Sequence, residues 1–143
     1  MEQLVALHKH WLIADSVKEV VTVKVGGDHG LPEELAEMAE MLSSFSRLSV
    51  LYGLIYVVIE GYREMKYQDD DIDSLLSNEE FVDTLRLFRN STFHYQKQPI
   101  PDKARKFIES EGSETWIRKV HLAFKRFFEK NLAIREMLKG FSA

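Results

Sequence analysis

The feature that most constrains the fold is the stretch from Pro32 to Lys66, which has only two glycines, at 53 and 61, and apolar side chains at helical spacing. Pro32 followed by two glutamates is typical of a helix start, where proline is tolerated and acids face the positive end of the dipole. The stretch therefore predicts one long helix. Its main apolar stripe comprises Leu35, Met38, Leu42, Phe45, Tyr52, Ile55 and Ile59.

The second half of this helix is apolar on nearly all sides, which predicts that other helices cover it on more than one face. The apolar run from Leu48 to Ile59 is 12 residues long. A membrane-spanning helix needs about 18 to 20 such residues, so we interpret the run as a buried helix and expect no membrane partner. The N-terminus lacks the basic start and cleavage site of a signal peptide, which favours a cytoplasmic protein.

The remaining segments also carry helical patterns. Ser77 with Glu80 forms a capping-box pattern that predicts the start of another helix. We predict further helices over 3–23, from the capping box through Tyr95, over 102–110, and over 114–139 with Gly140 closing the last. A chain of 143 residues fits one domain. The expectation is a single all-α domain, 1–143, folded as an up-and-down four-helix bundle with one or two additional short helices.

Composition excludes several kinds of site. The chain has no cysteine, which rules out disulfides, thiolate catalysis and sulfur-based zinc sites. The acidic run Asp69, Asp70, Asp71 and Asp73 lacks the glycine and closing glutamate of a calcium-binding loop, so we interpret it as a solvated loop with about one turn of helix. We expect neither a metal ion nor a cofactor.

The helix that ends near residue 95 has two distinct faces on a helical wheel. The predicted core stripe comprises Phe81, Leu85, Phe88, Thr92 and Tyr95. The opposite face mixes polar and apolar side chains: Val82, Asp83, Arg86, Leu87, Arg89, Asn90, Phe93 and His94. Apolar residues on the side away from the core indicate a second partner surface. A two-fold symmetric homodimer through this face would provide it.

The same face carries the candidate catalytic residues Arg89, Asn90 and His94. On an ideal helix, Arg89 and His94 are about 140° apart and about 7.5 Å apart along the axis. This spacing suits an extended phosphodiester, with arginine on the non-bridging oxygens and histidine at a bridging oxygen. His94 would be the general acid or base of metal-free RNA cleavage, Arg89 would stabilise charge on phosphorus, and Asn90 would orient substrate or histidine.

The hexapeptide R-N-S-T-F-H at 89–94 resembles the R-x4-H signature of the HEPN superfamily, in which a polar residue follows the arginine. The resemblance implies a compact helical bundle and a dimer in which two such segments meet. In active members it implies a metal-independent endoribonuclease of toxin–antitoxin, phage-defence or mobile-element systems, with Arg89, Asn90 and His94 as the catalytic set and an antitoxin protein as a partner. In one toxin branch a modifiable tyrosine lies two residues after the histidine. Here Gln96 holds that place, so this regulation is not carried over.

A basic group follows the candidate catalytic residues. Residues 86–106 carry a net charge of about +5, whereas the whole chain has a formal charge of −4. The predicted RNA-binding residues are Arg86, Lys97, Lys103, Arg105 and Lys106. A charged surface helix is the alternative explanation for the cluster.

Three functional hypotheses follow from these patterns. The first is a dimeric endoribonuclease that uses Arg89 and His94. The second is a non-catalytic dimeric module that binds a partner, a nucleotide or RNA through the same face. In the third, Arg89 and His94 only hold helices together.

Overall fold

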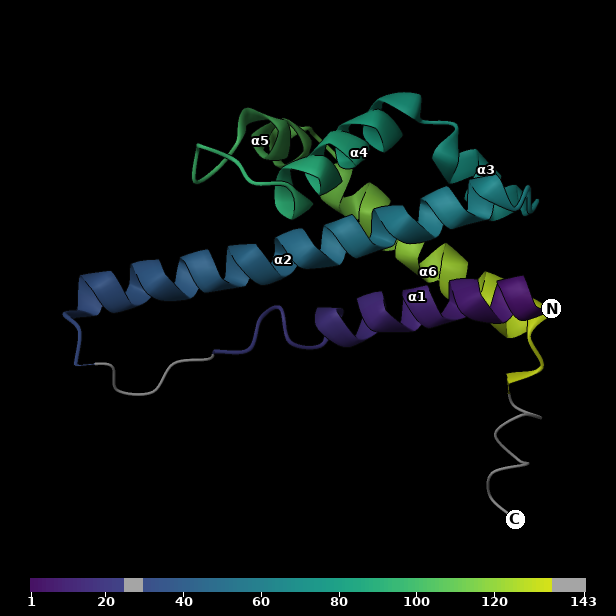
Figure 1. Ribbon diagram of the computed structural model, residues 1–143, viewed down its shortest axis with the longest axis horizontal. Coiled ribbons are helices and arrows are strands. Elements are labelled where there is room, and N and C mark those ends of the chain that lie inside the picture. Colours follow the sequence, from purple (N-terminus) through teal and green to yellow (C-terminus); the bar gives the residue numbers. More distant parts are fainter. Residues whose placement is uncertain (25–29, 135–143) are drawn as a thin grey trace, which may run out of the picture.

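The computed structural model describes residues 1–24 and 30–134, which form helices and no strand (Figure 1). The described helices are α1 (Glu2–Lys18), α2 (Glu33–Glu64), α3 (Asp70–Leu76), α4 (Glu79–Phe93), α5 (Asp102–Glu109) and α6 (Ser113–Asn131). The prediction of an all-α protein is confirmed. The first helix ends at Lys18, before the predicted end near Val23, and the acidic run forms the seven-residue helix α3.

The long helix α2 is covered along its C-terminal half, as its apolar sequence predicted. α1 lies antiparallel along one side of it, and α4 packs on another (Figure 1). Gly61 leaves room for the Leu7 side chain of α1, because a Cβ at residue 61 would lie 2.7 Å from Cδ1 of Leu7. Ile55, Val58 and Ile59 are all buried in this half.

The N-terminal half of α2 differs from the prediction. Leu35, Met38 and Leu42, which were expected in the core, are 50%, 53% and 45% exposed. α4 ends at Phe93, whose ring lies against Gly53 in the middle of α2. The apolar stripe of α2 therefore extends toward the N-terminus of α2, past the end of α4. The prediction that this half of the stripe lies in the core is wrong.

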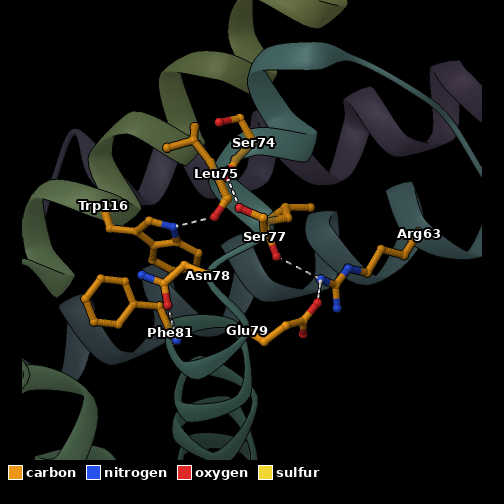
Figure 2. Close-up of polar contacts among 9 residues, drawn as sticks. Arg63, Ser74, Leu75, Ser77, Asn78, Glu79, Phe81 and Trp116 are labelled. Atoms are coloured by element: carbon orange, nitrogen blue, oxygen red, sulfur yellow. Dashed lines mark hydrogen bonds and ion pairs between the residues drawn. The ribbon is translucent and has the colours of Figure 1, made fainter.

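The start of α4 is capped one residue later than predicted (Figure 2). The Asn78 side chain is the cap, since its Oδ1 accepts a hydrogen bond of 3.2 Å from the Phe81 backbone N–H. The Ser77 hydroxyl instead donates to the Ser74 carbonyl at 2.6 Å. The predicted capping box at Ser77 is therefore wrong. The α3–α4 turn is fixed further by the Trp116 indole N–H, which donates to the Leu75 carbonyl at 2.9 Å.

Burial along α4 corrects the predicted wheel at two places. Leu85 and Phe88 are fully buried, as expected. Val82, which was assigned to the outward face, is only 3% exposed, because α4 packs against both α2 and α5. Tyr95, which was assigned to the core, is 91% exposed because the helix ends at Phe93 and His94 has an extended backbone.

The last helix, α6, supplies much of the core. Phe124 and Phe128 are buried on it, and Trp116 contacts Phe81 of α4. The helix ends at Asn131, where the Leu132 backbone becomes extended, so the predicted continuation to Lys139 is wrong at this point. The predicted closing residue, Gly140, lies outside the described residues.

Among the described helices, α2 is the one that by length and composition could cross a membrane. Core helices of soluble proteins meet the same criterion. In the structure, α1 and α4 pack against the C-terminal half of α2.

Candidate functional site

The Arg89 side chain lies between α4 and α2 and contacts three other side chains. Its Nη1 lies 2.8 Å from Oε2 of Glu60, and its Nε donates to Oδ1 of Asn90 at 3.1 Å. Its guanidinium carbon lies 4.7 Å from the centre of the Tyr56 ring, which is cation–π distance. The structure thus brings two of the three predicted catalytic residues together and adds Glu60 and Tyr56.

Helical geometry explains why Tyr56 and Glu60 act together. The two residues are four apart on α2 and lie on the same face of that helix. Tyr56 is buried beneath the guanidinium, whereas the Glu60 side chain is 53% exposed. Burial raises the pKa of the Tyr56 phenol, Glu60 raises that pKa further, and Arg89 opposes both effects. Tyr56 is therefore an uncharged platform, and Glu60 forms a partly exposed ion pair with Arg89.

His94 lies outside the helix that carries the other two predicted catalytic residues. It is the C-cap of α4, with φ −113° and ψ 143°, and its side chain is exposed. Its backbone N–H still donates to the Asn90 carbonyl at 3.1 Å. The His94 backbone therefore still follows the rise of the helix, but its side chain points in a different direction from the one on an ideal wheel, because φ and ψ leave the helical region at this residue. Among the described residues, the hydrogen bonds of His94 are made by its main chain, which holds it near the end of α4.

The close contact between Phe93 and Gly53 fixes where α4 ends on α2. A Cβ on residue 53 would lie 2.5 Å from Cε2 of Phe93. Glycine at this position therefore lets the last turn of α4 approach α2, and Arg89 lies one turn earlier on the same helix. The position of the candidate site depends on this contact.

The predicted RNA-binding residues are at the surface around and beyond the end of α4. Arg86 pairs with Asp83 at 2.9 Å, and Arg105 lies 3.9 Å from Glu109 on α5. Lys97, Lys103 and Lys106 are exposed. In residues 1–24 and 30–134 these three lysines form no ion pair. Within the predicted RNA-binding set, these three lysines are the cations without an internal carboxylate partner in the described residues.

Sequence reasoning gave no role to Glu60 or Tyr56. The pattern that could have identified them is the first acidic residue after the long apolar run, preceded at helical spacing by an aromatic ring. A single charge at such a position needs an ionic or solvent partner. The partner here is 29 residues away in sequence, so local periodicity does not reveal it.

A second cluster surrounds His121 on α6. The imidazole is buried, its Nε2 lies 2.9 Å from Oδ1 of Asp15, and its ring stacks on Trp11 with centroids 4.9 Å apart. Burial lowers the pKa of His121, and Asp15 partly opposes this shift. These residues line a cavity of about 580 Å³ between α1, α2 and α6. His121 is thus a buried imidazole packed between α1 and α6.

In the part of the chain that the structure describes, no group of three or more histidine or acidic side chains is arranged to hold a metal ion. Comparisons with protein-family models, curated proteins and solved structures found no match.

Proposed function

We propose that the chain is a cytoplasmic, dimeric HEPN-like protein that cleaves RNA without a metal ion. The fold in this proposal is an up-and-down four-helix bundle with additional short helices. The observation that supports it best is the geometry around Arg89. Its guanidinium is oriented by Asn90 at the end of α4, and an exposed His94 follows five residues later.

In the proposed reaction, Arg89 binds the non-bridging oxygens of the scissile phosphate and stabilises the charge that develops on phosphorus. His94 removes the proton from the 2′-hydroxyl or donates one to the leaving 5′-oxygen. The 2′-oxygen bonds to phosphorus as the bond to the 5′-oxygen breaks, which leaves a 2′,3′-cyclic phosphate and a 5′-hydroxyl. Solvent water supplies or accepts the other proton.

Glu60 adds a requirement to this mechanism. Its carboxylate lies 2.8 Å from Nη1 of the guanidinium that would bind the phosphate. The phosphate must therefore displace the carboxylate or share the guanidinium with it. Lys97, Lys103 and Lys106 favour that exchange by raising the local concentration of a polyanion. Arg86 and Arg105 extend the same basic surface.

The test is cleavage of a mixed RNA pool in EDTA, with end-group analysis for cyclic phosphate. We expect activity in the wild type and its loss in both Arg89→Ala and His94→Ala, with unfolding transitions close to the wild type for His94→Ala. Arg118→Ala is the matched control, since this arginine is exposed on α6 and pairs only locally with Glu114. Equal cleavage by wild type and His94→Ala would refute the catalytic assignment. Co-purification with a neighbouring gene product would test for an antitoxin.

A second candidate is a non-catalytic dimeric module that binds a partner, a nucleotide or RNA through the same face. The Glu60–Arg89 ion pair favours it, because a guanidinium already neutralised can serve recognition or helix packing without chemistry. Specific RNA or protein binding without cleavage would support this module. Loss of folding in Arg89→Ala would instead favour a purely structural role.

A further inference from the structure

The first half of α2 presents a continuous apolar surface that no helix in the described residues covers. Its members are large, and each is about half exposed or more: Leu31 48%, Leu35 50%, Met38 53%, Met41 66% and Leu42 45%. Figure 1 shows this end of α2 extending past the ends of α4 and α1. Scattered apolar residues are normal on a surface, but five along one stretch mark an interaction site.

This surface points in the same direction as the face of α2 that binds α4. Residues 18 apart on a helix are separated by five complete turns and project the same way. Leu35, Met38 and Leu42 are each 18 residues before Gly53, Tyr56 and Glu60, respectively. Those three later residues contact Phe93 or Arg89 of α4. The exposed stripe is therefore the continuation of a helix-binding face.

The area of the surface approaches what a stable protein interface needs. Half-exposed leucine and methionine side chains each leave about 90 Å² open, so the five together offer about 450 Å². Phe93 and Tyr95, 50% and 91% exposed, stand at the end of α4 that faces this half of α2. With these two rings the surface reaches about 750 Å² per copy, close to the roughly 800 Å² per partner of a standard interface.

The charges on the same half of α2 argue against two other occupants. Glu33, Glu34 and Glu37 are exposed there, and Glu40 is partly exposed. Four carboxylates repel the phosphates of RNA, and they also oppose binding to an anionic lipid surface. Glu33 and Glu34 occupy the first turn, where a membrane-surface helix commonly has lysine or arginine on its polar face. A protein surface is the occupant that fits.

We propose that this surface binds the same surface of a second copy, so that the two α2 helices cross antiparallel about a two-fold axis near Leu42. A two-fold axis matches an apolar stripe with itself, and each partner helix then takes the place on α2 that α4 occupies further along. The antiparallel direction also brings the acidic start of one α2 beside the middle of the other. The α4–α5 loop, which carries exposed Lys97, stands on the same side of α2 as α4 (Figure 1).

Because the chain has no cysteine, single engineered cysteines can locate the axis. Leu35→Cys, Met38→Cys and Leu42→Cys would be oxidised at low protein concentration and analysed by non-reducing electrophoresis. A disulfide needs Cβ atoms about 3.5 to 4.5 Å apart, so only the position nearest the axis should form a covalent dimer rapidly. Leu12→Cys, on α1 and equally exposed, is the control that should stay monomeric. Rapid cross-linking at Leu12 but not on α2 would overturn the proposal.

Charge variants test the interface without oxidation. Sedimentation equilibrium of the full chain should show a wild-type dimer, and Leu42→Glu should raise the dimer dissociation constant by about a hundredfold, since each substitution enters the interface twice. Leu12→Glu, which replaces a leucine 48% exposed against 45% for Leu42, should leave that constant unchanged. A monomeric wild type, or a Leu42→Glu dimer as stable as the wild type, contradicts the proposal.

The inference rests on the dimer of the proposed function, but it places the two-fold axis near Leu42 of α2 instead of at the Arg89/His94 face of α4, and the two can fail separately. If Leu42→Glu breaks the dimer but the wild type does not cleave RNA, the interface is supported and the ribonuclease proposal is refuted. If the wild-type dimer cleaves RNA and Leu42→Glu does not weaken the dimer, the ribonuclease proposal is supported and this interface is refuted.

Discussion

Replacing Glu60 by glutamine separates a catalytic or binding role for Arg89 from a purely structural one. The substitution keeps the size and a hydrogen-bond acceptor but removes the charge that lies 2.8 Å from the guanidinium. The Arg89 side chain is 25% exposed and the Glu60 side chain is 53% exposed, which places the pair near the surface. Water therefore screens the pair, although its two charges are in contact.

The magnitude follows from that exposure. Two charges at this separation attract by several kcal/mol in a medium of intermediate dielectric, but measured exposed pairs contribute about 0 to 1 kcal/mol net. Glu60→Gln should therefore lower the free energy of unfolding by no more than about 1 kcal/mol, or roughly 3 °C in Tm. If Arg89 binds phosphate, losing its internal competitor should tighten RNA binding by about fivefold, which corresponds to about 1 kcal/mol.

The assay is a fluorescence anisotropy titration of a single-stranded RNA at two salt concentrations, with a thermal unfolding curve for the same samples. Glu79→Gln is the matched control, since it removes one carboxylate from an exposed ion pair with Arg63 at 3.2 Å. Both variants gain one unit of charge, so only an effect specific to Glu60 counts. Unchanged RNA affinity together with a Tm loss well above 5 °C would refute a ligand role for Arg89.

Other perturbations test the packing around the site. Asn78→Ala should lower the free energy of unfolding by about 1 kcal/mol in urea titrations through loss of the α4 cap, whereas Ser77→Ala should change it little; the opposite order would restore the capping box. Phe88→Ala, at a fully buried position, should cost about 3 to 5 kcal/mol by the same measurement, and a cost below 1 kcal/mol would contradict the packing of α4. Because burial lowers the pKa of His121 in the folded state, the unfolded chain binds more protons below about pH 6.5. Calorimetry should therefore show stability falling as the pH drops through that value, and His121→Gln should weaken this dependence. Gly53→Ala should move the Phe93 ring and reduce RNA cleavage more than it changes Tm, and unaltered cleavage would separate α4 placement from activity.

Helix existence was readable from the sequence because it depends on local periodicity and on few glycines and prolines. The positions where prediction failed depend on what lies around a helix. Val82 looked outward on a wheel with one core face, yet α4 is packed on two sides. The apolar stripe of α2 predicted that other helices pack against this face, but periodicity does not tell whether those helices belong to the same chain.

The candidate site shows the same division. Arg89 and Asn90 are neighbours in sequence, so their hydrogen bond follows from local geometry. The direction of the His94 side chain depends on the change from helical to extended backbone at the end of α4. Helical periodicity does not predict where such a change occurs. Glu60 and Tyr56 reach Arg89 through the packing of α2 on α4. Such a contact becomes visible only when both helices are placed.

The uneven cover along α2 has a consequence for the speed of hydrogen exchange. Amides between about Val58 and Tyr62 lie in the buried core and can exchange only through large-scale unfolding. Amides near Met38 and Met41 belong to the same continuous helix, but few buried contacts hold their turns closed, so they should open locally and exchange much sooner. One helix would then contain both the slowest and some of the fastest helical amides of the molecule. Protection of the early turns that rises with protein concentration would report the arrival of a second chain.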